Sequence, residues 1–340
     1  MVSPGKCVVA VVATSADVPL PAAPALAGCE VRFVTSREQL ASEAADADVV
    51  FAWEPRLDWI ETCWGWSPRL RWIAAATAGV DHLMFPALIE SDVVVTNSAG
   101  IFDSAMAEYA LALVSAVCAD LPATIRLQGR REWLHRETRR LAGSEVLVLG
   151  AGGIGRAIAR LLAGVGANTR CLARTPRVDP EIGPVAGVGD LRSLLPSADF
   201  VILALPFTPA TAGIIGAPEL ALLRPGAWIV NLGRGGLIDE PALVAALAGG
   251  AIGGAALDVF TTEPLPAGSP LWDLPNVIVS PHMPGDFRGW DKALTSLFLE
   301  QLTRYRAGRP LANVVDKTLG YVPSAARCGG AVTFSRPVRR

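Results

Sequence analysis

Residues 146–175, VLVLGAGGIGRAIARLLAGVGANTRCLART, contain an aliphatic run, a group of glycines and an amphipathic stretch in that order. The run 146–149 is typical of a strand that is buried on both faces of a parallel sheet. Between positions 154 and 165 apolar side chains recur at helical spacing, and residues 168–172 can form a second strand. The glycines lie where the first strand becomes the helix. The stretch therefore predicts a β-α-β unit of about 30 residues.

The glycines of this junction have the spacing G-x-G-x-x-G, which suits a dinucleotide. Gly150 permits a tight turn, Gly152 leaves room for a pyrophosphate against the backbone, and Gly155 lets the helix pack closely on the strand. The helix N-terminus adds N–H groups and a partial positive charge for the phosphates. Glycine-rich turns occur in many loops, but a turn between a strand and a helix favours dinucleotide binding.

The residues after the second strand indicate which dinucleotide binds. NAD-binding units carry an acidic residue about 20 positions after the glycines, and it binds the ribose 2′-hydroxyl. This chain has Arg174 and Thr175 there, followed by Pro176 and Arg177. An arginine pairs with a 2′-phosphate and a threonine hydroxyl can donate to it, whereas the alternative is a solvated surface loop. We predict NADP(H) as the preferred cofactor, with NAD(H) as the alternative.

The composition is that of a globular protein. The 340 residues predict about two domains, and 51% hydrophobic residues supply large cores. A net charge of −2 gives no electrostatic footprint for nucleic acid or an anionic membrane, so we expect neither as a partner. Six cysteines without a C-x-x-C pair and three histidines predict no metal site and no disulfide framework. These features, and a short N-terminal apolar run that suits a strand better than a signal peptide, predict a cytoplasmic protein.

Alternating strand and helix patterns predict two α/β domains. Residues 1–100 suit a small flavodoxin-like domain. Its strands are predicted at 8–12, 31–34, 49–52, 70–75 and 93–96. The apolar helix 101–119 and the basic stretch 126–140 then lead into a second domain, where four strands follow the first two. They are predicted at 200–205, 228–232, 254–259 and 277–280. Six strands with helical crossovers make a Rossmann doubly wound parallel sheet.

Polar side chains follow three of these later strands. They are Arg234 in NLGRGG, Glu263 in DVFTTEP and His282 in SPH. Because ligands of such sheets gather at the carboxyl ends of the strands, we expect the three to converge on a nicotinamide. Arg234 would bind and polarise a 2-ketoacid, His282 would donate a proton to its carbonyl, and Glu263 would orient the imidazole and favour its charged form. Each residue alone has a structural explanation, but three at successive strand ends favour catalysis.

The order of these blocks resembles the D-isomer-specific 2-hydroxyacid dehydrogenase family. The blocks are VLVLGAGGIGRAIA, LPFTPATAGIIG, VNLGRGGLIDEPAL, GGAALDVFTTEPLP and VIVSPHMPG, with AGVD and NSAG...AEYALAL upstream. Arg174 and the loop that starts Trp53-Glu54-Pro55 are most similar to the glyoxylate/hydroxypyruvate reductase branch. The resemblance implies a homodimeric NAD(P)-dependent oxidoreductase that reduces a small 2-ketoacid, glyoxylate-like, hydroxypyruvate-like or bulkier, to the D-2-hydroxyacid. It also implies that Arg234, Glu263 and His282 are the catalytic set.

The resemblance further implies domain limits and ligand contacts. Residues 1–100 and 285–320 would form the substrate domain, and 101–284 the NAD(P)-binding domain. The expected cofactor contacts are Gly150, Gly152, Gly153, Ile154, Gly155, Arg174, Thr175, Pro206, Thr211, Leu232, Gly233, Arg234 and Asp258. The expected substrate contacts are Ala78 and Gly79, whose loop backbone could hold a carboxylate or be a plain turn, with Trp53 and Arg234. The tail 321–340 is rich in small residues, and we expect it to be disordered.

Two other functions remain open. A catalytically silent NAD(P)-sensing protein could keep this fold, and a Rossmann enzyme of another class, such as a methyltransferase, would leave Arg234 and His282 unexplained. The histidine block reads PHMPGDFRGW rather than the commoner PHI-G-x-x-T of the family. This departure leaves the substrate side chain open and makes Arg288 either an extra anion contact or a surface residue.

Overall fold

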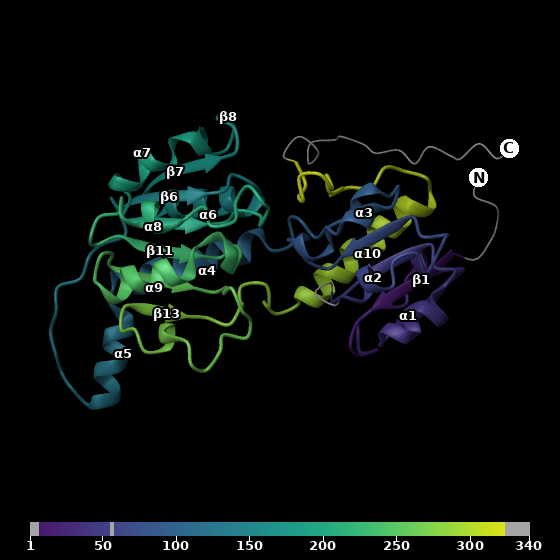
Figure 1. Ribbon diagram of the computed structural model, residues 1–340, viewed down its shortest axis with the longest axis horizontal. Helices are drawn as coiled ribbons and strands as arrows, with labels where there is room; N and C mark the ends of the chain where they lie inside the picture. The colour runs from purple at the N-terminus through teal and green to yellow at the C-terminus, as the bar shows by residue number, and fades with distance from the viewer. Residues whose placement is uncertain (1–6, 55–57, 324–340) are drawn as a thin grey trace. The chain divides into compact units, whose positions relative to one another are not determined.

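The computed structural model describes residues 7–54 and 58–323 of the chain. The chain divides into two compact units, each with its own sheet (Figure 1). The first unit comprises Met1–Ile101 and Arg288–Arg340, and the second unit is Phe102–Phe287. Of the predicted tail 321–340, all but the first three residues lie outside the described part of the chain.

The first unit has a five-stranded parallel sheet in the order β2-β1-β3-β4-β5. Its strands are β1 (Cys7–Val12), β2 (Cys29–Val34), β3 (Val49–Ala52), β4 (Trp72–Ala75) and β5 (Val94–Thr96). Its helices are α1 (Arg37–Glu43), α2 (Trp59–Thr62), α3 (Pro86–Glu90) and α10 (Trp290–Arg306). This strand order is that of a flavodoxin-like sheet, as predicted.

Helix α10 follows the second unit in sequence but packs on the sheet of the first. Phe298 stacks on Phe51 of β3 and on Trp72 of β4, with ring centroids 4.2 and 5.6 Å apart. Leu294 and Leu302, four residues before and after Phe298, are also buried. Residues four apart share one face of a helix, so this face closes the core of the first unit.

The second unit has an eight-stranded sheet in the order β13-β12-β11-β10-β6-β7-β9-β8. Its strands are β6 (Glu145–Leu149), β7 (Asn168–Ala173), β8 (Arg177–Asp179), β9 (Gly183–Gly187), β10 (Phe200–Leu203), β11 (Trp228–Asn231), β12 (Gly254–Leu257) and β13 (Val277–Val279). Its helices are α4 (Asp103–Cys118), α5 (Leu121–Arg130), α6 (Gly153–Gly164), α7 (Leu191–Leu194), α8 (Ala217–Leu220) and α9 (Glu240–Ala248). All neighbouring strands run parallel except β8, which pairs antiparallel with β9. The doubly wound sheet is as predicted.

The prediction of six strands in this sheet is wrong, because β8 and β9 are also present. The β9 segment, GPVAG, begins and ends with glycine and contains a proline, and this composition disfavours a strand. It is a strand because it pairs with β7, with Val185 opposite Cys171. The edge strand β8 then pairs with β9 and carries Arg177.

The lengths and compositions of the helices bear on membrane insertion. Within residues 7–54 and 58–323, no single helix is long and apolar enough to cross a membrane, although α4 and α5 pass on length and composition as a pair bent by 61°.

Candidate active site

The turn between β6 and α6 requires glycine at two positions for reasons internal to the fold. Gly150 has a φ of 118°, and a Cβ there would lie 2.4 Å from the carbonyl oxygen of Ala204. A Cβ at Gly155 would lie 1.8 Å from the carbonyl oxygen of Gly150. The turn, the loop that follows β10 and the first turn of α6 are thus in direct backbone contact, which a side chain would separate.

Packing within the fold does not require glycine at position 152. Its φ is −79°, and a Cβ there would meet no described atom within 4 Å. The open space lies at the N-cap of α6, where N–H groups are directed outward and the helix dipole favours an anion. Buried Gly153 and half-buried Ile154 form the first turn behind it. These residues fit a dinucleotide whose pyrophosphate occupies the space in front of Gly152.

Three arginines come from segments next to the glycine turn, one on α6, one after β7 and one on β8. Arg174 and Thr175 follow β7 and are exposed. Arg177 on β8 donates from Nη2 to the carbonyl of Ala151, inside the glycine turn, at 2.8 Å. Buried Asp179 lies between Arg177 and Arg156, with N–O distances of 3.8 and 3.5 Å. No role for Arg177 was evident from the sequence, because only the pairing of β8 brings it back to the turn.

The loops after β10 and β11 contact each other. Thr211 donates its hydroxyl hydrogen to the carbonyl of Pro206 at 2.7 Å, which closes the first loop. Asn231, at the end of β11, accepts from the N–H of Gly233 and donates to the carbonyl of Arg234, at 3.1 and 2.9 Å. A Cβ at Gly236 would lie 2.7 Å from the ring of Phe207, so the two loops pack without a gap.

The residues predicted to be catalytic follow β11, β12 and β13. The Arg234 guanidinium donates to its neighbour's carbonyl, Gly233, at 2.9 Å. A Cβ at Gly235 would lie 1.9 Å from the carbonyl carbon of Phe260, so the arginine loop is packed directly against the loop that carries Glu263. The structure therefore brings the Arg234 and Glu263 loops together in one unit.

Glu263 contacts His282 directly. Its Oε2 lies 2.9 Å from His282 Nδ1, and its Oε1 accepts the N–H of Phe260 at 3.1 Å. The two side chains are partly exposed, 33% for His282 and 23% for Glu263. A carboxylate that is fixed by the backbone and placed at Nδ1 orients the ring and selects its tautomer.

Asp258, predicted to lie on the nicotinamide side, is 1% exposed at the end of β12. Burial raises the pKa of its carboxyl, and hydrogen bonds from Ser280 Oγ and the Met283 N–H act in the opposite direction. The carbonyl of the same residue accepts the N–H of His282 at 2.9 Å. Asp258 is thus a buried support of the histidine loop, and sequence spacing did not predict this contact.

The predicted substrate loop lies in the first unit and is held by hydrogen bonds to its carbonyls. Asn97 Nδ2 donates to the carbonyl of Ala78 at 2.6 Å, and the N–H of Ser98 donates to the carbonyl of Thr77 at 2.9 Å. In a trans peptide the N–H points away from the C=O. The N–H groups of Ala78 and Gly79 are therefore directed away from these partners, an arrangement that suits an anion.

Trp53, also predicted to contact substrate, is in the first unit at the end of β3. Its ring stacks on that of Trp290, the first residue of α10, with centroids 5.3 Å apart. Trp290 could not be found from the sequence, since it lies more than 200 positions away from Trp53. Arg288, between the histidine loop and α10, is exposed.

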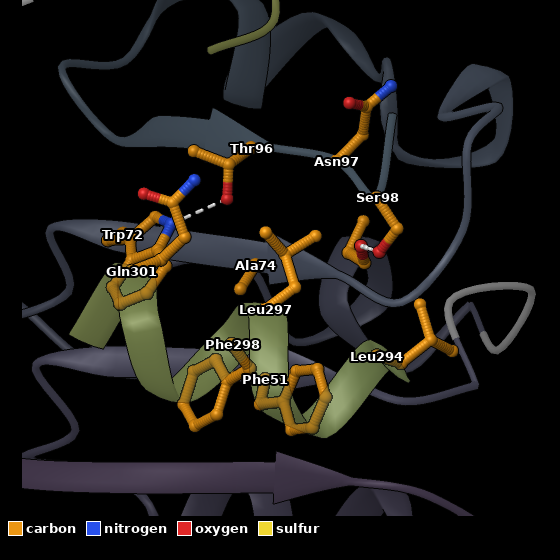
Figure 2. Close-up of a pocket in the computed structure, with 11 residues that line it drawn as sticks. Phe51, Trp72, Ala74, Thr96, Asn97, Ser98, Leu294, Leu297, Phe298 and Gln301 are labelled. Carbon is orange, nitrogen blue, oxygen red and sulfur yellow. Dashed lines mark hydrogen bonds between the residues drawn. The ribbon is translucent and has the colours of Figure 1, made fainter. Parts of the chain in front are cut away.

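A cavity in the first unit is too small for a substrate. Figure 2 shows it between the sheet and α10, with Phe51, Trp72, Thr96, Phe298 and Gln301 among its lining residues. Its volume is about 10 Å³, room for one water molecule at most. Trp72 Nε1 donates to Thr96 Oγ1 at 2.9 Å within its wall. The cavity is a small packing defect under α10.

The two units define a two-domain α/β protein with a dinucleotide-binding sheet. Residues 111–284, half of the chain, match the family profile described as D-isomer specific 2-hydroxyacid dehydrogenase, NAD binding domain. The chain therefore belongs to the D-isomer specific 2-hydroxyacid dehydrogenase family, whose members are NAD(P)-dependent enzymes.

Individual relatives agree with this assignment. Over 216 residues the chain is 35% identical to glyoxylate/hydroxypyruvate reductase A of Serratia proteamaculans, covering 64% of this chain and 68% of that one. Over 246 residues it is 35% identical to D-3-phosphoglycerate dehydrogenase of Methanocaldococcus jannaschii, covering 71% of this chain but only 46% of that relative, about half its length. An NADPH-dependent glyoxylate/hydroxypyruvate reductase from Sinorhizobium meliloti, crystallised with NADP and sulfate, has a TM-score of 0.79 and 30% identity, covering 93% of this chain and 100% of that one.

Proposed function

We propose that the chain is an NADPH-preferring reductase that converts a small 2-ketoacid into the D-2-hydroxyacid. The observation that carries the proposal is the contact between Glu263 and His282 at the ends of β12 and β13, beside the Arg234 loop and on the same sheet as the glycine turn. A proton donor near neutral pH and a fixed cation are what reduction of a ketoacid requires. The reductase from Serratia proteamaculans supports the substrate class through its name.

Each catalytic residue has one task in this proposal. Arg234 binds the ketoacid through its guanidinium and polarises the carbonyl that is reduced. His282, protonated at Nε2, donates that proton to the carbonyl oxygen as the alkoxide forms. Glu263 holds the ring through Nδ1 and stabilises its charged form before transfer. A nicotinamide cofactor supplies the hydride when bound, and the family resemblance makes Ala78, Gly79 and Trp53 further candidates for substrate contact.

The proposed preference for NADPH over NADH rests on the positively charged side chains that follow β7. Arg174 and Thr175 are exposed there and can pair with a 2′-phosphate, and Arg177 is already hydrogen-bonded to the glycine turn. Buried Asp179 is paired with two arginines and is not presented to a ribose hydroxyl. We propose that Gly152, Gly153, Ile154, Pro206, Thr211, Leu232, Gly233 and Asp258 line the rest of the cofactor site.

The test is oxidation of NADPH and NADH, followed by absorbance, across ketoacids graded in size from glyoxylate and hydroxypyruvate upward. We expect turnover with NADPH, and we expect His282→Ala to lose it while NADPH still quenches or enhances protein fluorescence as in the parent. Cofactor binding without turnover of any ketoacid by the parent would favour a silent NAD(P)-sensing protein. Failure to bind either nicotinamide would favour a Rossmann enzyme of another class.

We also propose that the chain forms a homodimer through the arm, defined as residues 121–140. The arm consists of α5 and the irregular segment after it, at the outer edge of the second unit (Figure 1). Trp133 is fully exposed, and Ile125 and Leu134 are 66% and 60% exposed. Arg136 ties the segment back to α5 by bonds to Asp120 and Thr124, both at 2.7 Å. An ordered segment that exposes a tryptophan and two aliphatic side chains is typical of an interaction surface.

The charge of the arm supports a second copy of the chain as its partner. The arm contains six arginines and two glutamates, a net charge of +4, within a chain of net charge −2. The remainder of each copy therefore carries −6 and attracts the arm of the other. A two-fold dimer would use both arms in the same way.

A further inference from the structure

A chain of buried hydrogen bonds runs from helix α4 to the carboxylate of Asp258. The hydroxyl of Tyr109, on α4, is hydrogen-bonded to Ser280 Oγ, and Ser280 Oγ donates to Asp258 Oδ1 at 2.6 Å. A serine hydroxyl has one hydrogen, which Ser280 gives to Asp258, so Tyr109 must be the donor to Ser280. Ser280 and Asp258 are 5% and 1% exposed. The order of donation is therefore fixed from Tyr109 through Ser280 to Asp258.

Asp258 in turn holds the backbone around His282. Its carbonyl accepts the N–H of His282, and its Oδ1 accepts the N–H of Met283, both at 2.9 Å. His282 has a φ of 58°, in the left-handed region that non-glycine residues adopt only when their surroundings fix it. The two hydrogen bonds to Asp258 fix the peptide groups before and after the Cα of His282. They account for a backbone conformation that directs Nδ1 to Glu263.

We propose that Tyr109 and Ser280 are positioning residues for proton transfer, which act by fixing Asp258 and through it the backbone of His282. Neither side chain is hydrogen-bonded to the imidazole, and the inference rests on the proposed role of His282 as the proton donor. A displacement of about 1 Å in a proton donor can cost about 100-fold in rate, so small losses of alignment are measurable. Burial raises the pKa of Asp258, and the hydrogen bond from the Ser280 hydroxyl acts in the opposite direction, so the same bond favours the charged form of the acceptor.

The kinetic test compares Ser280→Ala and Tyr109→Phe with the conservative variant Ser280→Thr. Ser280→Ala should lower kcat by about tenfold or more with the KM for NADPH unchanged. Tyr109→Phe should cause a smaller loss, since Ser280 can still donate to Asp258, and Ser280→Thr should restore most of the activity. Ser144→Ala is the matched control, because Ser144 is a buried serine of the same unit that bonds to the carbonyl of Arg140. It should leave kcat unchanged.

A second readout needs no turnover. Hydrogen–deuterium exchange of the amides of His282 and Met283, in the protein without substrate, should be faster in Ser280→Ala and Tyr109→Phe than in the parent and the Ser144→Ala control. Unchanged exchange and unchanged kcat would overturn the inference, as would a loss of activity matched by an equal loss of NADPH binding or of thermal stability. If His282→Ala keeps full activity, the proposed function fails, whereas the exchange measurement still decides whether the two residues hold the loop.

Discussion

The proposed role of His282 depends on its contact with Glu263. Glu263 Oε2 lies 2.9 Å from Nδ1, while the other carboxylate oxygen is held by the N–H of Phe260. A carboxylate at this distance presents a negative charge to the ring, and a neutral amide of the same shape does not. Replacement by glutamine therefore separates the charge of Glu263 from its shape.

We predict that Glu263→Gln lowers kcat for ketoacid reduction by roughly 100-fold, with the KM for NADPH little changed. Steady-state kinetics at constant pH measures both values. Glu240→Gln is the matched control, because Glu240 accepts the N–H of Thr261 in the same loop at 3.1 Å. Equal kcat values for Glu263→Gln and the parent would contradict a role for this charge.

The buried carboxyl of Asp258 should make the stability of the protein depend on pH. Burial raises the pKa of its carboxyl above the ordinary value of 3.8, so the native state binds a proton that the unfolded chain has released. The stability contributed by that proton is present below pH 3.8 and is lost as pH rises through the native pKa. Asp258→Asn cannot ionise, and its Oδ1 can still accept from Ser280 and Met283.

The stability of Asp258→Asn relative to the parent should therefore increase from about pH 4 toward about pH 7. Urea unfolding at several pH values in this range measures the difference in free energy of unfolding. A difference that stays constant or decreases over the range would show that burial does not govern this carboxyl.

The positions of individual functional side chains could be predicted from the sequence only where they directly follow a predicted strand. The sequence predicted Arg234, Glu263 and His282 as strand-end residues, because parallel strands end at one edge. It could not predict the bond between Tyr109 and Ser280, which are 171 positions apart. It also missed Arg177, whose contact with Ala151 depends on the pairing of β8. Such contacts follow from tertiary packing, which leaves no periodic signal in the sequence.

At the scale of elements, the three glycines of the β6–α6 turn are required for different reasons. A Cβ at Gly150 would lie 2.4 Å from the carbonyl oxygen of Ala204, and a Cβ at Gly155 would lie 1.8 Å from that of Gly150. These oxygens cannot move without displacing the ends of β10 and β6. Gly152 faces open space. The fold thus requires the outer two glycines, whereas no described neighbour requires the middle one, and the proposed cofactor site accounts for it.

We predict that Gly152→Ala folds with a melting temperature close to that of the parent but binds NADPH at least about tenfold more weakly, because its methyl group occupies the place of the pyrophosphate. Gly155→Ala should fail to fold or lose several degrees of stability. Thermal unfolding and fluorescence titration with NADPH measure the two effects. Tight NADPH binding by Gly152→Ala would place the pyrophosphate elsewhere.

Elements differed in how well the sequence predicted them. Strands with unbroken aliphatic runs, such as β3 and β6, were predicted to within one residue of their observed limits. Their side chains are buried on both faces, so composition alone identifies them. Strand β9 has glycine at both ends and is a strand because it pairs with β7 and β8. Helix α5 was expected only as part of a basic stretch, and its exposed apolar side chains became evident once the helix limits were known.

On the scale of the whole molecule, the proposed dimer has its contact surface on the arm. Large exposed tryptophans are the side chains that most often dominate the binding energy of an interface, at about 2 kcal/mol or more each. Trp133 is fully exposed on the arm, and Trp272, half exposed elsewhere in the second unit, provides a comparison. Trp272 donates its Nε1 hydrogen to the carbonyl of Pro266, so its ring already has a partner outside the arm.

We predict that the parent sediments as a dimer, at twice its chain mass of 35.6 kDa, and that Trp133→Ala weakens the dimer by roughly 30-fold. Adding Ile125→Asp should give a monomer at micromolar concentration, because it places a charge in the apolar contact. Trp272→Ala should remain dimeric. Because the arm is basic and the remainder acidic, dissociation of the parent should increase with salt. A monomeric parent at all concentrations would contradict the assignment, and binding of that monomer to anionic vesicles would give the arm a membrane partner instead.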